Sequence, residues 1–258
     1  MIELKTLGEI DVMRRSGRIV AGLLAHLATL VRPGIRTRQL DESAGEYLRR
    51  SGAAPAFLNY RGFPATICVS VNEEVVHGIP GERKLREGDL VSLDAGAVVD
   101  GLFADAAVTV PVGAVSPQAR RLSEVTKRAL EDGIAAASVG GRLSDISHAV
   151  QRVVEHAGFG VVRDFVGHGI GRALHEEPPV PNFGAPNMGP RLRPGMVLAI
   201  EPMVTMGGYE VQILSDGWTV VTKDRSLAAH FEHTVALTER GPEILTHIGQ
   251  PANGGTDR

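Results

Sequence analysis

The chain repeats part of its own sequence after 107 residues, and this duplication limits the folds it can adopt. Residues 85–94 read LREGDLVSLD, and residues 192–201 read LRPGMVLAIE. Each copy has Leu-Arg-x-Gly, a mostly apolar run and a final carboxylate, which is Asp94 in one copy and Glu201 in the other. Two copies of one module usually pack about a pseudo-two-fold axis. We therefore expect a site built from both copies at their junction.

Each half is predicted to contain two helices followed by strands. Apolar residues recur at helical spacing, and Thr37 and Ser144, at the same offset, are expected to cap helices. Ser116 is expected as the N-cap before Pro117. The expected helices span residues 8–31, 38–51, 117–138 and 145–157. The expected strands span residues 66–71, 90–99, 102–110, 197–206, 209–215, 218–222 and 228–238, with hairpin turns at Asp100-Gly101 and Asp216-Gly217.

This order of elements predicts an α+β fold with a mainly antiparallel sheet and helices on one face. The 258 residues are 43% hydrophobic, which supplies a sizeable core. We expect one catalytic domain over residues 1–248, with pseudo-repeats at about 8–113 and 117–240. Residues 249–258 are polar and Gly-rich and are expected to form a flexible tail.

Composition narrows the possible partners and compartments. Lys and Arg total 27 against 30 Asp and Glu, a net charge of −3 that indicates neither nucleic-acid nor membrane binding. The single cysteine, Cys68, excludes internal disulfides and zinc fingers. The chain shows no secretory signal, and its longest apolar stretch, Ile19 to Val31, is too short to span a bilayer. We expect a cytoplasmic protein.

Acidic residues inside apolar strands indicate a metal site. If Val99 faces Leu102 across the predicted hairpin, then Asp94 and Asp105 are diagonal neighbours on one face of the sheet. The second half supplies Glu201 in VLAIEPM and Glu232 in AAHFEHTVAL. Four buried carboxylates would repel one another unless cations lie between them. A pair of divalent ions suits this arrangement.

Histidines could complete the carboxylate cluster. His168 lies in the Gly-rich segment GHGIGRALHEEP, and His77 in VVHGIP is a further candidate. Strand alternation would turn His230 and His233 away from Glu232, so we leave both out. The expected ligands are Asp94, Asp105, His168, Glu201 and Glu232. Oxygen-rich ligands with one imidazole suit two ions of Mn, Fe(II), Co or Zn, which would support hydrolysis of an amide or ester.

With these acidic and histidine motifs, the sequence resembles a known family, the type I methionine aminopeptidases of the pita-bread fold. The resemblance covers nearly all of residues 1–248. It is carried by VNEEVVHGIP, by LVSLDAG with an aspartate eleven residues after Asp94, and by GHGIGRALHEEP, LAIEPM and FEHTVAL. The five motifs in order are far more specific than any one of them.

The resemblance implies roles for the five candidate ligands. Asp94 would chelate one metal ion, and His168 and Glu201 would bind the other. Asp105 and Glu232 would bridge both ions. Glu201 would also be the proton shuttle of the reaction.

The resemblance also implies residues that handle the substrate. His175 would donate a hydrogen bond to the scissile carbonyl oxygen, and His77 would contact the substrate near the scissile amide. Aromatic and sulfur-bearing walls suit a thioether. The methionine side chain would enter a pocket formed by Tyr60, Phe63, Cys68, Leu174 and Trp218.

The predicted function is removal of the initiator methionine from nascent proteins by two-metal amide hydrolysis. The expected partners are N-terminal Met peptides, with the ribosome as a further candidate, and the chain is expected to be a monomer. Two alternatives stay open: a peptidase of the same fold with Xaa-Pro specificity, and a non-catalytic binding module.

Overall fold

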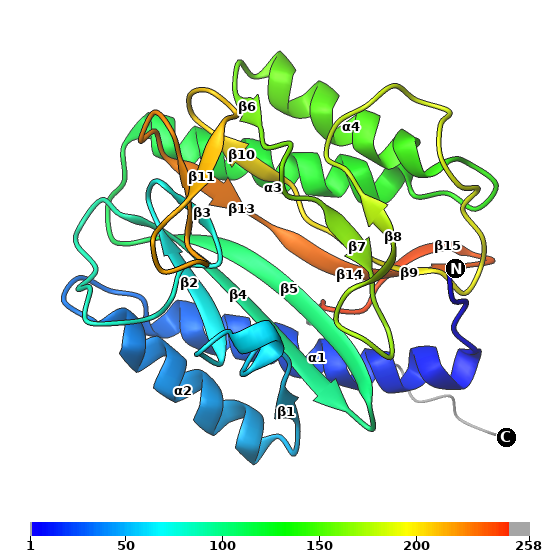
Figure 1. Ribbon diagram of the computed structural model, residues 1–258, viewed down its shortest axis with the longest axis horizontal. Helices are drawn as coiled ribbons and strands as arrows, with labels where there is room; N and C mark the ends of the chain where they lie inside the picture. Colours follow the sequence, from blue (N-terminus) through cyan, green and yellow to red (C-terminus); the bar gives the residue numbers. More distant parts are fainter. Residues whose placement is uncertain (1, 248–258) are drawn as a thin grey trace, which may run out of the picture.

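Four α-helices and a nine-stranded antiparallel sheet form the framework of the protein in the computed structural model, which describes residues 2–247 (Figure 1). The predicted tail at 249–258 therefore lies outside the described residues. Among the described helices, none is both long and apolar enough to cross a membrane. The helices are α1 (Leu7–Leu30), α2 (Thr37–Arg50), α3 (Pro117–Ala136) and α4 (Leu143–His156), and a 3-10 turn, η1, spans Tyr60–Gly62.

The large sheet has the order β1-β4-β5-β14-β9-β7-β8, with β2 also paired to β4 and β15 to β14. Two separate three-stranded sheets have the orders β13-β10-β6 and β11-β12-β3. The strands are β1 (Ala54–Pro55), β2 (Ile67–Val71), β3 (Glu74–Val76), β4 (Leu90–Val99), β5 (Leu102–Pro111), β6 (Gly160–Val161), β7 (Gly167–Gly169), β8 (Glu176–Val180), β9 (Val197–Ile200), β10 (Met203–Thr205), β11 (Val211–Ile213), β12 (Val220–Thr222), β13 (Ala228–His230), β14 (Glu232–Thr238) and β15 (Gly241–Ile244).

The fold repeats the duplication of the sequence. The strand order β2-β4-β5 in the first half is mirrored by β7-β9-β14 in the second, and β5 and β14 pair at the centre. Equivalent hydrogen bonds recur: the Gly34 amide donates to the Leu85 carbonyl, and the Gly140 amide donates to the Leu192 carbonyl. Gly34 and Gly140 have φ values of 89° and 90°, a left-handed conformation that glycine adopts without a steric cost. The α+β class with a duplicated antiparallel sheet is confirmed.

The predicted caps of α2 and α4 are wrong. Helix α2 begins one residue earlier than expected and α4 two residues earlier, so Thr37 is the first residue of its helix and Ser144 the second. Their hydroxyls instead accept hydrogen bonds from loop amides, Gly81 to Thr37 and Met188 to Ser144. Each hydroxyl thus ties a helix start to the loop that precedes β4 or β9. The prediction for α3 is confirmed, because the Ser116 hydroxyl accepts from the Ala119 amide.

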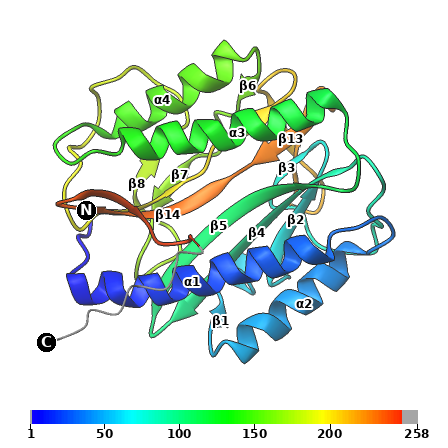
Figure 2. The same cartoon turned by 180° about the vertical axis from the view of Figure 1, so that it is seen from behind.

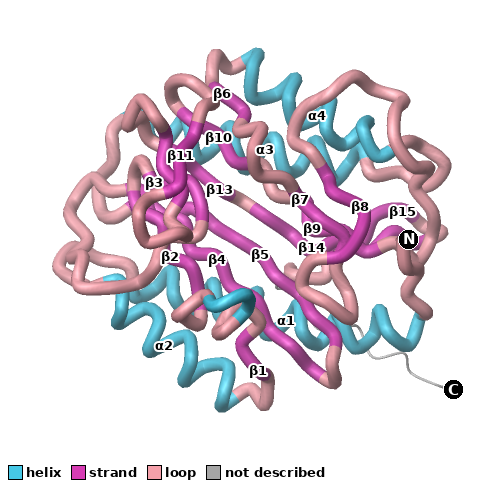
Figure 3. Tube along the Cα trace, viewed as in Figure 1, coloured by secondary structure: helices cyan, strands magenta, loops and turns pink. Residues whose placement is uncertain are grey.

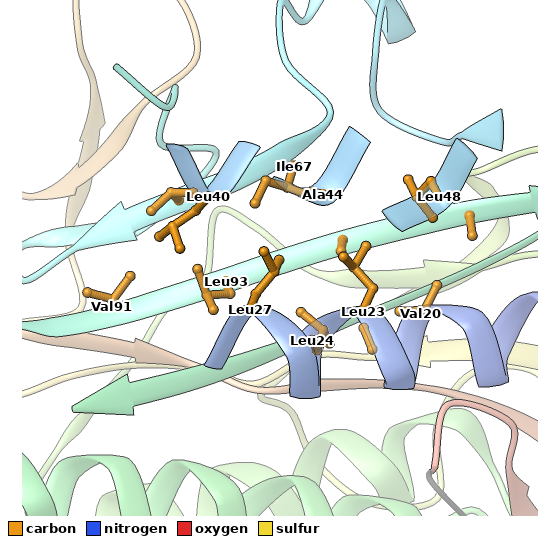
Figure 4. Packing of buried hydrophobic residues seen from close by; sticks show 14 of the residues in the cluster. Val20, Leu23, Leu24, Leu27, Leu40, Ala44, Leu48, Ile67, Val91 and Leu93 are labelled. Atoms are coloured by element: carbon orange, nitrogen blue, oxygen red, sulfur yellow. The ribbon is translucent and has the colours of Figure 1, made fainter. Parts of the chain in front are cut away.

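Helices cover one face of the sheet and leave the other free for a site. From behind, α1 and α3 lie in front of the strands (Figure 2), and the tube view shows the strands of the large sheet between the two pairs of helices (Figure 3). The apolar stripe of α1, with Leu23 and Leu27 fully buried, packs against α2 and β4 (Figure 4). Leu40 of α2 and Leu93 of β4 are also fully buried in this cluster.

Two predicted strands are interrupted, and a candidate ligand lies at one break and directly after the other. The expected strand 197–206 divides into β9 and β10 at Glu201-Pro202, because proline has no amide hydrogen for the ladder. The expected strand 228–238 divides into β13 and β14 at Phe231. At the first break the chain passes from the large sheet to a small one, and at the second it returns from that small sheet to the large one. The strands missed by the prediction, β1, β3, β6, β7, β8 and β15, have at most five residues each.

Candidate metal centre and active-site pocket

Three neighbouring strands bring carboxylates to one face of the sheet. The predicted register is confirmed, because Val99 pairs with Leu102 and Asp94 pairs with Ala107. Ala107 also pairs with Glu232 of β14 on its other side. Residues in one cross-strand row share a face, so Asp94 and Glu232 flank the small Ala107 side chain. Asp105, two residues earlier on β5, lies on the same face.

The second half adds an imidazole and a fourth carboxylate to this face. His168 of β7 pairs with Ala199 of β9, two residues before Glu201. The Nε2 atom of His168 lies 3.6 Å from Oδ2 of Asp105 and 3.6 Å from Oε1 of Glu201. One ligand atom each from Asp105, His168 and Glu232 lies within 4.8 Å of the others. All five predicted ligands line one cavity between the strands of the two halves.

Hydrogen bonds fix the orientation of two candidate ligands. The His168 Nδ1 atom is 2.9 Å from the Gly169 carbonyl. A carbonyl only accepts, so Nδ1 carries the proton and Nε2 presents a lone pair to the cluster. The Thr234 hydroxyl lies 3.1 Å from Oδ1 of Asp105 and accepts from the Asp105 amide at 3.0 Å.

The cluster fits a bound cation and is unfavourable without one. Burial raises the pKa of Asp94 and Glu201, each to about 8, and repulsion from neighbouring carboxylates adds to the shift. Burial and carboxylate repulsion also raise the pKa of Glu232 well above its usual value. Among the described residues, Oδ1 of Asp94 is buried without a hydrogen-bond partner. Converging carboxylate oxygens and one imidazole nitrogen match the ligands of a divalent metal ion.

The exclusion of His230 from the cluster is wrong. The chain breaks at Phe231, so strand alternation does not carry across from Glu232 to His230. Its Nε2 atom lies 3.4 Å from Oε2 of Glu201. For His233 the exclusion agrees with the structure, because its Nδ1 bonds to the hydroxyl of Thr246 at 2.9 Å.

A cavity of about 310 Å³ opens over the carboxylate cluster. All seven predicted substrate-contacting residues line it, namely Tyr60, Phe63, Cys68, His77, Leu174, His175 and Trp218. Burial and nearby carboxylates raise the pKa of the Cys68 thiol well above its usual value, which disfavours a nucleophilic role. The prediction missed the lining residues Phe57, Arg61, Val76, Asp164, Phe165, Val166 and Met203. Val76 could have been predicted from the sequence, because it directly precedes His77 in the motif VVHGIP.

Aromatic contacts hold the two pocket histidines in place. His77 has φ 60°, a strained conformation for a residue with a side chain, and its ring packs edge-on to Phe165 and Trp218. Burial lowers the pKa of His77 to about 4. His175 stacks on Tyr60, and its Nδ1 lies 2.9 Å from the Tyr60 hydroxyl.

The sequence profile of metallopeptidase family M24 matches residues 11–239. The chain belongs to this family and is a hydrolase, which confirms the predicted family and enzyme class.

Named relatives narrow the class further. A methionine aminopeptidase from Clostridium perfringens is 54% identical over 248 residues, which cover 96% of this chain and 100% of that protein. Methionine aminopeptidase 1 from Bacillus subtilis is 52% identical with the same coverage. These names agree with the predicted methionine aminopeptidase activity.

Solved structures share the fold of this chain. The crystal structure of methionine aminopeptidase from Thermotoga maritima superposes with a TM-score of 0.94 at 48% identity, covering 95% of this chain and 99% of that one. The prolidase from Pyrococcus furiosus, at 22% identity and a TM-score of 0.79, shares the fold; the match covers 96% of this chain and 66% of that one.

Proposed function

We propose that this protein is a metal-dependent aminopeptidase that removes the initiator methionine from nascent proteins. The observation that carries the proposal is that the carboxylate cluster lines the same cavity as Phe63, Cys68 and Trp218. Apolar, aromatic and sulfur-bearing walls suit an unbranched thioether side chain. The near full-length relatives named methionine aminopeptidase support the same substrate.

We further propose that the cluster holds two divalent ions, of Fe(II), Mn, Co or Zn. Asp94 would bind one ion, His168 and Glu201 the other, and Asp105 and Glu232 both. When bound, such ions polarise the scissile carbonyl and acidify water. Four carboxylates carry four negative charges, which two divalent cations would neutralise.

The chain's own residues would position the substrate and move the proton. Glu201 would carry the proton to the leaving amine, as a buried carboxylate whose pKa is raised toward neutrality. His175 would donate from Nε2 to the scissile carbonyl oxygen, because its Nδ1 can accept from the Tyr60 hydroxyl. His77, fixed between Phe165 and Trp218, would contact the substrate near the scissile amide.

Methionine release from Met-Ala-Ser by metal-stripped protein tests the proposal. Mn, Fe(II), Co and Zn are added back separately, and Glu201→Ala is the control. We expect metal-dependent release that the variant loses. No release with any metal, from folded protein that binds the metal, would refute the methionine assignment.

The two alternatives predict different results in the same assay. An Xaa-Pro peptidase would cleave Ala-Pro peptides in preference to Met-Ala-Ser, and the shared fold of the prolidases is its support. A binding module would bind a peptide without cleaving it. Residence in the cytoplasm, a monomeric state and contact with the ribosome stay predictions.

A further inference from the structure

His230 places a buried imidazole in the carboxylate cluster, and the proposed mechanism assigns this side chain no role. Its side chain is almost fully buried, with the residue 1% exposed. Its Nε2 atom lies 3.4 Å from Oε2 of Glu201 and has no hydrogen-bond partner among the described residues. Leaving a buried polar atom unpaired costs free energy. A partner for Nε2 is therefore expected within the filled site.

The backbone of His230 is clamped from the neighbouring strands. Its amide donates to the Thr109 hydroxyl at 2.9 Å, and that hydroxyl donates to the His230 carbonyl at 2.8 Å. The Ser92 hydroxyl lies 2.9 Å from the same Thr109 oxygen and can donate to its remaining lone pair. The clamp fixes His230 at the end of β13 and keeps its ring at the cluster.

Two imidazoles therefore flank the Glu201 carboxylate, one at each oxygen. His168 faces Oε1 with a bare Nε2, because its Nδ1 proton is committed to the Gly169 carbonyl. A second lone pair facing Oε2 would add repulsion among the buried acceptors of the cluster. A proton on Nε2 of His230 would give Oε2 a hydrogen-bond donor instead.

We propose that His230 is a positioning residue that donates its Nε2–H to Oε2 of Glu201, so that Oε1 stays turned toward His168 and a bound divalent ion. Donors of this kind orient metal ligands, and their loss typically weakens metal binding by about 10- to 100-fold. The inference rests on the proposed metal site, but it does not depend on which peptide is cleaved.

Calorimetric titration of Mn²⁺ into metal-stripped protein tests this role. His230→Leu removes the donor, and His230→Gln keeps an N–H group at a similar distance from the backbone. We expect the dissociation constant to rise by about 10-fold or more in His230→Leu and to stay close to the wild-type value in His230→Gln. If His230→Leu does not fold, His230→Met provides the same loss of the donor.

His233→Leu is the matched control, because it removes a nearby imidazole that bonds to Thr246 instead of facing the cluster. Its metal affinity should equal that of the wild type. Unchanged affinity in His230→Leu, or an equal loss in His233→Leu, would overturn the proposal. Equal losses in His230→Gln and His230→Leu, with an altered visible spectrum of bound Co²⁺, would instead make His230 a metal ligand. Because calorimetry needs no peptide, a failure of methionine release would leave this test intact.

Discussion

At the residue scale, one hairpin turn holds Asp94 and Asp105 on the same face of the sheet, and a strand break separates His230 from Glu232. Asp94 and Asp105 follow from a single hairpin turn, Asp100-Gly101, which fixes the register of ten paired residues on each strand. His230 could not be found in the same way. Alternation holds only within an unbroken strand, and the chain leaves β13 for β14 between His230 and Glu232.

The raised carboxylate pKa values predict how metal binding depends on pH. In the metal-free fold the pKa of Asp94 is raised from 3.8 to about 8, chiefly by burial. Between these values the folded state holds more protons than the unfolded state, so the metal-free protein loses stability as pH rises. Bound cations remove this loss. We expect the Tm gain from Mn²⁺ to be larger by several degrees at pH 8 than at pH 5.5.

Thermal unfolding with and without Mn²⁺ at both pH values measures this gain. Asp94→Asn is the control, since it removes one of the repelling carboxylates. Without metal at pH 8 the variant should melt above the wild type, and its response to Mn²⁺ should be reduced. A wild-type gain that stays constant or shrinks between pH 5.5 and pH 8 would contradict the shared-cation arrangement.

At the element scale, the segment before α1 braces the loop that carries Leu174 and His175. Lys5 is nearly buried, and its Nζ lies 2.5 Å from Oε2 of Glu176, while Oε1 of Glu176 accepts from the Arg172 and Ala173 amides. Hydrophobic patterns give no signal for this brace, because a lone lysine near the start of a chain is ordinarily a surface residue.

Removing the Lys5 side chain should lower both the stability of the fold and the affinity of the pocket for its substrate. Lys5→Met leaves the partly buried Glu176 carboxylate without its cation, and losing one partner of a buried pair costs about 3–5 kcal/mol. We expect a lower free energy of unfolding in urea and a higher KM for Met-Ala-Ser. The exposed pair Arg15–Asp100 gives the control, because Arg15→Met should cost less than about 1 kcal/mol. Equal effects of the two variants would show that the brace contributes nothing.

At the scale of the whole molecule, the duplication was predictable from the sequence. The contact between α1 and the chain after β15 was not. The repeat is visible in ten aligned residues of each half. The contact of α1 with the chain after β15 depends on Gly17, where an added Cβ would lie 2.3 Å from the Leu245 carbonyl oxygen. A glycine inside a helix indicates a close approach without naming what approaches.

Two glycines of α1 should respond oppositely to alanine. Gly17→Ala forces α1 away from Leu245, and overpacking of this kind costs about 1–3 kcal/mol. Gly8→Ala meets nothing within 4 Å, so it should be neutral or stabilise the helix by up to about 1 kcal/mol. Urea unfolding of both variants measures the difference. A Gly17→Ala protein as stable as the wild type would mean that α1 and the chain at Leu245 are not closely packed.

The mirrored strands also place one imidazole where symmetry would put a hydroxyl. His168 pairs with Ala199, and Ser70 pairs with Ser92, the residue equivalent to Ala199 in the first half. The Ser70 hydroxyl accepts from the Gly78 amide beside His77. The symmetric arrangement of strands thus encloses an asymmetric set of candidate ligand atoms. The first half supplies only oxygen atoms, and the second half supplies both nitrogen and oxygen. Two ions held between the halves would be inequivalent, and a titration should fill them in sequence.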